Sequence, residues 1–160
     1  MSCSKLFWLF CLCALTACST TPTQPIKTAA RTDSVTSQVL DNAYSWLGTP
    51  YQYGGTTKAG IDCSGLVHEV YSQVKIALPR TAQQQSRLGN TITKNKAMSG
   101  DLIFFRTSDR KIYHVGIINK VQGNKLSFIH SSESKGVIIS SSDNVYWKPR
   151  IVKVVRVINQ

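Results

Sequence analysis

The chain has 160 residues, with 19 Lys or Arg against 8 Asp or Glu, so its net charge at neutral pH is +11. This length suits a single compact domain with one hydrophobic core. The positive charge would suit nucleic acid, anionic lipid or an acidic polymer, but the basic residues are scattered and no DNA- or RNA-binding motif is present. We therefore expect no nucleic-acid partner, while anionic lipid or an acidic polymer stays open as the counter-charge beside a merely solvated basic surface.

The first 17 residues predict a targeting segment that is removed from the mature protein. Lys5 is the only charge before LFWLFCLCAL, an apolar run of ten residues. A membrane span takes roughly 20 residues, so the run suits a signal peptide instead. It ends in LTAC, which resembles the box at which bacterial lipoproteins are cleaved before a cysteine that then carries lipid. We expect a signal peptide over 1–17 and lipidation of Cys18, with an ordinary secretory signal as the alternative.

Residues 18–32 follow the leader as the lipidated cysteine and STTPTQPIKTAART, which is rich in Thr and Pro and has no hydrophobic period. This composition predicts a disordered tether, with the folded domain over 33–160. Cys3, Cys11 and Cys13 leave with the leader and Cys18 carries the lipid, so Cys63 is the one free thiol of the mature chain. A lone thiol in an oxidising compartment is expected to be either buried or functional.

Helices come first along the folded part of the chain. Apolar residues recur at three- and four-residue spacing from Asp33 and stop at Gly48, which predicts a first helix with Val35, Val39, Ala43 and Trp46 on its inner face. A loop rich in Gly and Thr follows, in which Gly54 and Gly55 are expected to allow a tight turn. A second helix carries Leu66, Val67, Val70, Tyr71 and Val74, and a short helix, TAQQQSRLG, follows Pro79.

Strands occupy the second half of the chain. LIFF, YHVGIIN, KLSFIH, GVIISS and RIVKVVRVI are separated by turn residues and are typical of β-structure. Because helices precede strands instead of alternating with them, the pattern predicts an α+β fold, with N-terminal helices packed on an antiparallel sheet of five or six strands.

Cys63 stands where the second helix is expected to begin, with Asp62 as its N-cap. The unpaired N–H groups and dipole of a helix N-terminus favour a thiolate, so we expect this position to lower the pKa of the thiol. The same N–H groups could hold the oxyanion that forms when a carbonyl is attacked. The alternative is a small buried apolar side chain.

A thiolate nucleophile needs a base, and the chain has three histidines. His68 lies about 140° around the helix from Cys63, so it is expected to serve packing or the surface. His114 and His130 lie on consecutive expected strands. They share a face of the sheet if the intervening turn holds three or five residues or if one strand carries a bulge. We expect this arrangement, with both side chains projecting toward Cys63, His114 as the base and His130 as its orienting residue.

Five motifs in order carry a resemblance to a known family: GTPYQYGG, IDCSGLV, GDLIFF, HVGII and FIHSS. They resemble the NlpC-type cysteine peptidases of bacterial cell walls, and GVIISSSDNVYW with the lipoprotein leader resembles the small lipoproteins of that family in Gram-negative bacteria. The match runs from about Ser45 to Trp147. The resemblance implies a papain-like α+β fold and hydrolysis of amide bonds in peptidoglycan stem or crosslink peptides through a cysteine thioester.

The resemblance also implies roles for individual residues. By position, Cys63 is the nucleophile, His114 the base and His130 the third, orienting residue. Tyr51 matches a tyrosine beside the nucleophile that helps bind substrate or the oxyanion, with a packed loop aromatic as the alternative. Asp62 and Ser64 match positions that contact a substrate amine in some relatives, and helix capping is the alternative for both.

Three other interpretations remain open. The chain could be a wall-binding lipoprotein without hydrolytic activity, or an acyl or amide transferase that uses the same triad. A zinc site of Cys63, His114 and His130 is weakened because the chain lacks a local C-x-x-C or H-x-x-x-H pair. We expect no metal, nucleotide or redox cofactor. We further expect a monomer that is held by its lipid in the cell envelope, at the outer membrane facing the periplasm because Ser19 follows the lipidated cysteine.

Overall fold

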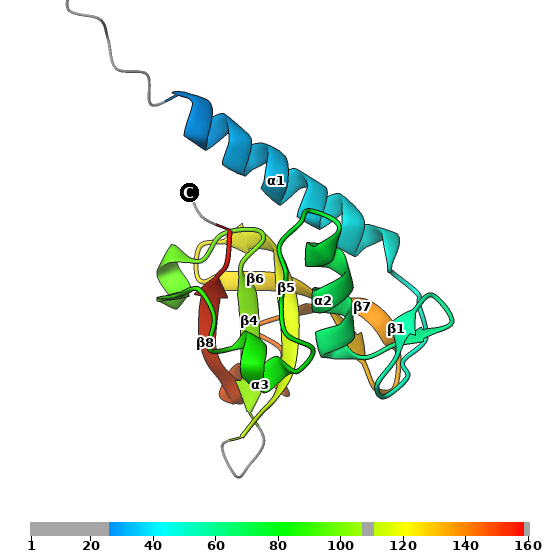
Figure 1. Cartoon of the computed structure of the whole chain (residues 1–160). Helices are drawn as coiled ribbons and strands as arrows, with labels where there is room; N and C mark the ends of the chain where they lie inside the picture. Colours follow the sequence, from blue (N-terminus) through cyan, green and yellow to red (C-terminus); the bar gives the residue numbers. More distant parts are fainter. Residues whose placement is uncertain (1–25, 107–110, 159–160) are drawn as a thin grey trace, which may run out of the picture.

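A computed structural model describes residues 26–106 and 111–158 of the chain. Its long first helix, α1 (Ile26–Ser45), packs on α2 (Cys63–Ser72), and α2 and the short α3 (Ala82–Gln85) lie against β5 (Figure 1). A two-stranded hairpin, β1 (Thr56–Thr57) with β2 (Gly60–Ile61), precedes α2.

The sheet has six strands in the order β3-β8-β4-β5-β6-β7, and each neighbouring pair is antiparallel. The predicted α+β fold is therefore confirmed. The strands are β3 (Asn90–Ile92), β4 (Leu102–Arg106), β5 (Ile112–Gln122), β6 (Lys125–Ser132), β7 (Gly136–Ser141) and β8 (Ile151–Arg156). Two single-turn helices, η1 (Lys94–Lys96) and η2 (Lys148–Arg150), lie between strands.

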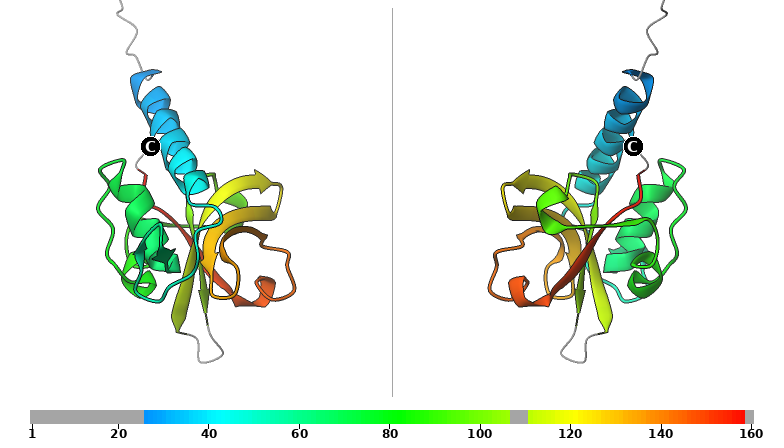
Figure 2. Two further views of the ribbon diagram at one scale, coloured as in Figure 1. Left: turned by 90° about the vertical axis from the view of Figure 1, so that its right-hand side faces the viewer. Right: turned by 90° about the vertical axis from the view of Figure 1, so that its left-hand side faces the viewer.

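Two apolar clusters pack on the two faces of this sheet. The cluster under the helices is the larger one and contains Val39, Ala43 and Trp46 of α1, on the face that their spacing predicts. The cluster on the other face is smaller and contains Ile103, Phe105, Ile118, Leu126, Phe128 and Val154. Figure 2 shows α2 and α3 on one side of the sheet, whereas the β6–β7 end of the sheet curves away from these helices toward the side where η2 lies.

The first helix begins earlier than the sequence pattern predicts. We expect a tether up to residue 32, whereas α1 starts at Ile26, directly after Pro25. The segment 26–32 contains no Gly or Pro and includes Ala29, Ala30 and Arg31, which are strong helix formers, so the helix extends beyond its apolar stripe. The expected leader, Cys18 and Ser19 lie outside the described residues, and none of the described helices is long and apolar enough to cross a membrane.

Candidate active site

The N-terminus of α2 holds Cys63 as its first residue, and Asp62 is the N-cap as predicted. The Asp62 backbone is extended, at φ −91° and ψ 174°, and its Oδ1 accepts the Gly65 N–H at 2.7 Å. The loop before the helix is tied to the same carboxylate, because Gly54 N–H donates to Oδ2 at 2.8 Å. Gly54 has a φ of +75°, which confirms the tight turn expected there.

Arg80 donates hydrogen bonds to both oxygens of the Asp62 carboxylate. Its Nη1 lies 2.8 Å from Oδ1 and its Nη2 lies 2.6 Å from Oδ2, and the same guanidinium donates to Ser64 Oγ at 3.0 Å. Burial alone would raise the pKa of Asp62, but the hydrogen bonds from Arg80, Gly65 and Gly54 bring the pKa below its ordinary value. Asp62 is thus an anion whose two oxygens are already held by protein donors.

The Cys63 sulfur is more buried than the sequence suggests. The residue is 9% exposed, belongs to the core cluster under the helices, and its Sγ lies 3.9 Å from Tyr113 O. Burial raises the pKa of the Cys63 thiol to about 11, and the Asp62 charge adds to this. Backbone N–H groups of Val115, Ser64 and Cys63 itself act in the opposite direction but do not outweigh burial. The expected lowering of the thiol pKa is therefore wrong for the resting site.

The sulfur reaches the sheet where two strands separate. The pairing between β5 and β6 begins at Ile117 and Ile129, while the Cys63 contacts lie nearer the start of β5, at Tyr113 and Val115. Ser131 of β6 donates its hydroxyl to Ile61 O, just before α2, at 2.7 Å. The N-terminus of α2 thus meets backbone groups that a continuous β5–β6 ladder would have used.

The two histidines meet on the sheet face opposite α2. His114 Nε2 and His130 Nδ1 lie 2.9 Å apart, and both residues are buried. The β5–β6 turn has only two residues, but a bulge at Asn119 shifts the register by one, which confirms the expectation of a turn of odd length or a bulge. Direct opposition does not occur: the register that pairs Ile117 with Ile129 brings His130 across from Gly116, so His114 is its diagonal neighbour.

Burial controls the charge of this pair. It lowers the pKa of His114 well below the ordinary 6.5, and the neighbouring His130 adds to the effect. Burial also lowers the pKa of His130 to about 4. Both imidazoles are therefore neutral at neutral pH. On its far side His130 Nε2 lies 2.9 Å from Ser140 Oγ of β7, so three neighbouring strands contribute to one row of polar groups.

Trp147 covers the histidine pair. Its ring stacks on His114, with centroids 4.9 Å apart and planes 21° apart, and meets His130 edge-on at 5.0 Å. Phe105 and Phe128 pack against the histidine rings from within the sheet. This aromatic shell is the physical cause of the lowered imidazole pKa values.

A cavity of about 660 Å³ connects the predicted site residues. Cys63 and His114 line it together with Tyr51, Asp62 and Ser64, so these five predicted residues share one space, and His130 supports it through His114. A second cavity, of about 450 Å³, lies beside the histidine pair and is lined by His114, His130, Ser140 and Trp147 among others.

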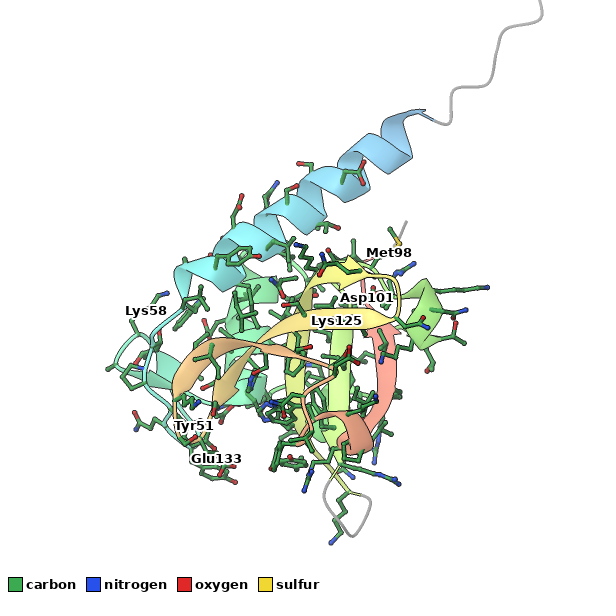
Figure 3. All side chains as sticks on the ribbon, turned by 180° about the vertical axis from the view of Figure 1, so that it is seen from behind. Tyr51, Lys58, Met98, Asp101, Lys125 and Glu133 are labelled. Atoms are coloured by element: carbon green, nitrogen blue, oxygen red, sulfur yellow. The ribbon has the colours of Figure 1, made fainter. Side chains whose placement is uncertain are left out.

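Tyr51 and Glu133 both line the first cavity, and their side chains lie near each other (Figure 3). Burial raises the pKa of the Tyr51 phenol, and the charge of Glu133 raises it further. The phenol is therefore a neutral O–H donor at neutral pH.

The model of the NlpC/P60 family matches residues 48–156, which is more than half of the chain. The chain belongs to the NlpC/P60 family. It is 43% identical over 148 residues to the probable endopeptidase NlpC of Escherichia coli (strain K12), a match that covers 87% of this chain and 93% of the relative. It is 39% identical over 131 residues to the murein DD-endopeptidase MepS/murein LD-carboxypeptidase of the same strain, covering 81% and 67%.

The fold of solved NlpC/P60 proteins agrees with this assignment. A crystal structure of an NlpC/P60 family protein from Bacillus cereus ATCC 10987 superposes with a TM-score of 0.72 at 28% identity, over 78% of this chain and 40% of that one. The predicted resemblance is thereby confirmed.

Three residues of this NlpC/P60 site escaped the sequence analysis: Arg80, Ser140 and Trp147. Arg80 directly follows Pro79, and Trp147 belongs to a quoted motif, yet neither had a spacing that tied it to the nucleophile. Within the described ranges, no three His, Cys, Asp or Glu side chains are grouped so as to hold a metal ion.

Proposed function

We propose that this chain is a peptidoglycan endopeptidase in which Cys63 is the nucleophile, His114 the general base and His130 the residue that orients His114. The observation that carries the proposal is the shared cavity of Cys63 and His114, backed by the 2.9 Å contact between the two imidazoles. The roles of the three residues agree with those implied by the family motifs.

The chemistry follows from the two nitrogens of His114. Nε2 is engaged by His130, so Nδ1 is the nitrogen that takes the thiol proton. The sulfur bonds to the scissile carbonyl carbon, and the tetrahedral intermediate collapses as the C–N bond breaks and the amine leaves with the proton from His114. Water then gives a proton to His114 and attacks the thioester, and the product acid leaves as the thiol is restored.

The resting thiol and imidazole are both neutral in this scheme, because burial opposes either charge. Proton transfer and attack on the carbonyl then belong to the same stage of the reaction, and His114 acts as a general base instead of as one half of a standing ion pair. N–H groups at the start of α2 and the neutral Tyr51 phenol are the donors that would stabilise the oxyanion.

The substrate class follows from the relatives, which are named as murein endopeptidases. The proposed substrates are amide bonds in murein stem or crosslink peptides. For Asp62 and Ser64 the proposed part is indirect: both are held by Arg80, so they shape the rim of the cavity beside the nucleophile.

Attachment to the envelope is a second part of the proposal. Cleavage after residue 17 and lipidation of Cys18 would hold a monomeric enzyme at the outer membrane, facing the periplasm. The support is the LTAC box and Ser19. In cells, the wild-type chain should enter the detergent phase on Triton X-114 partitioning, and Cys18→Ser should not; equal partitioning would contradict the anchor.

Digestion of purified sacculi with the soluble domain tests the activity. Mass spectrometry should show new muropeptides with the wild-type domain and none with Cys63→Ala or Cys63→Ser, while circular dichroism shows the same fold. Hydrolysis by Cys63→Ala at the wild-type rate would rule out the mechanism. Products in which the cleaved peptide is joined to an added amine would show a transferase. Binding of the wild-type domain to sacculi without any new product would show a wall-binding protein.

A further inference from the structure

A row of polar groups crosses three neighbouring strands behind the nucleophile. His114 of β5 contacts His130 of β6, and His130 in turn contacts Ser140 of β7, with heavy-atom distances of 2.9 Å at both steps. We infer that Ser140 is a positioning residue of the catalytic row: its hydroxyl accepts the Nε2–H of His130 and thereby selects the tautomers in which His114 can act as the base. This inference rests on the proposed roles of Cys63 and His114.

The register of β6 and β7 builds the second contact. His130 pairs with Ile138, and Phe128 pairs with Ser140, so Ser140 is a diagonal neighbour of His130 on the same face of the sheet. His114 has the same diagonal relation to His130 from the other side. Both contacts therefore depend on strand pairing and not on a flexible loop.

Whether His114 can act as the base depends on which ring nitrogens of His114 and His130 carry a proton. To take the thiol proton at Nδ1, neutral His114 must carry its own proton on Nε2 and donate it to His130 Nδ1. His130 is then protonated on Nε2 and needs an acceptor there. Ser140 Oγ is the atom at that place.

The opposite order would disable the base. If Ser140 donated to His130 Nε2, His130 would carry its proton on Nδ1 and donate it to His114 Nε2. Neutral His114 would then be protonated on Nδ1, with no lone pair left for the thiol. The geometry allows both orders, so the surroundings of the Ser140 hydroxyl must choose between them.

Those surroundings favour Ser140 as the acceptor. Ser140 is half-buried and lines the second cavity, so its own O–H can point into that space. His130 is 1% exposed, so its Nε2–H has no comparable access to solvent. When Ser140 accepts, the buried Nε2–H has its partner and the serine O–H can still reach solvent in the cavity, so this order leaves no donor of the row unpaired.

Two substitutions at position 140 test this. Ser140→Ala removes the acceptor, so kcat on soluble muropeptide dimers should fall roughly tenfold with little change in KM, because the base is then partly in the wrong tautomer. Ser140→Thr keeps a hydroxyl on a strand and should restore most of the rate. Ser127→Ala is the matched control: Ser127 lies on β6, three residues before His130, and should keep the wild-type kcat.

Nitrogen-15 NMR of histidine reads the tautomers without any need for activity. In the wild type, the His130 proton should reside on Nε2, and Ser140→Ala should give a mixture of Nδ1–H and Nε2–H forms. A wild-type His130 protonated on Nδ1, or a folded Ser140→Ala variant with wild-type kcat, would overturn the inference. If Cys63→Ala still hydrolyses murein, the proposed function fails, and the NMR result on His130 then stands by itself.

Discussion

His114 and His130 meet edge to face, with ring centroids 4.9 Å apart, although they are not partners across the sheet. The position across from His130 is Gly116, and a Cβ there would lie 3.3 Å from His130 Cβ and 2.7 Å from Phe128 Cδ2. The missing side chain leaves the space in which the diagonal contact forms. The imidazole pair therefore depends on a glycine and a bulge as much as on the histidines themselves.

The two histidines should differ in their effect on the rate. His114→Ala removes proton transfer and should lower kcat by roughly 100- to 1,000-fold, whereas His130→Ala removes orientation only and should cost less. His68→Ala is the control, because His68 contacts Leu78 O outside the cavity and should keep the wild-type rate. Turnover of muropeptides measures all three, and a larger loss for His130→Ala would reverse the assigned roles.

Stability should fall as the pH drops from 6.5 to 4. The pKa of His130 is about 4 in the folded state and near 6.5 in the unfolded state. Between these pH values the imidazole binds a proton in the unfolded chain but not in the folded chain. The stabilisation is fully present above pH 6.5 and is lost as the pH falls toward 4, by up to about 3 kcal/mol.

Urea unfolding at a series of pH values measures this slope. His130→Asn removes one of the two buried imidazoles whose pKa is lowered, so its stability should change by clearly less between pH 6.5 and 4, and His114 should account for the slope that remains. The window lies above the titration of Asp62, whose pKa is lowered, so that carboxylate does not contribute to it. An unchanged slope in His130→Asn would show that another group is responsible.

Trp147 should set the acid limit of activity. Its ring stacks on His114 and borders His130, which keeps water from both imidazoles. Trp147→Ala should raise the pKa values of both toward 6.5, so the acid limb of the kcat/KM profile should move to higher pH. Trp147→Phe retains an aromatic cover and should move it less. If the acid limbs of the wild type and of Trp147→Ala are identical, Trp147 does not control the pKa of the base.

Arg80 should matter more for stability than its surface position suggests. Arg80→Ala leaves the Asp62 carboxylate, whose side chain is 10% exposed, without its main partner, and should cost about 2 kcal/mol in the free energy of unfolding. Arg80→Lys cannot reproduce the two-pronged contact and should recover only part of the loss.

Urea unfolding compares these variants with Arg87→Ala, which removes an exposed arginine seven residues away and should be neutral. Arg80→Ala should also disturb the surroundings of Cys63, because the Asp62 carboxylate accepts hydrogen bonds both from the loop at Gly54 and from the first turn of α2. Wild-type stability in Arg80→Ala would mean that water replaces the guanidinium at no cost.

Local sequence rules predicted most of the frame of this molecule. The periodic positions Val39, Ala43 and Trp46 identified the buried face of α1, and Asp62 identified the start of α2, because both signals depend on residues within one or two turns. The short strand β3 and the early start of α1 were missed: three residues carry no clear alternation, and residues 26–32 have helix-forming side chains without an apolar stripe.

The sequence by itself determined which residues carry the proposed chemistry, since a cysteine after an N-cap and two histidines on consecutive strands are readable from their order and spacing. Only the tertiary structure decided their state. Burial raises the pKa of Cys63 and lowers those of the histidines, Trp147 covers the pair, and Ser140 and Arg80 come in from distant segments. Solvent exclusion and diagonal contacts between strands depend on how the whole chain packs, and no local spacing encodes them.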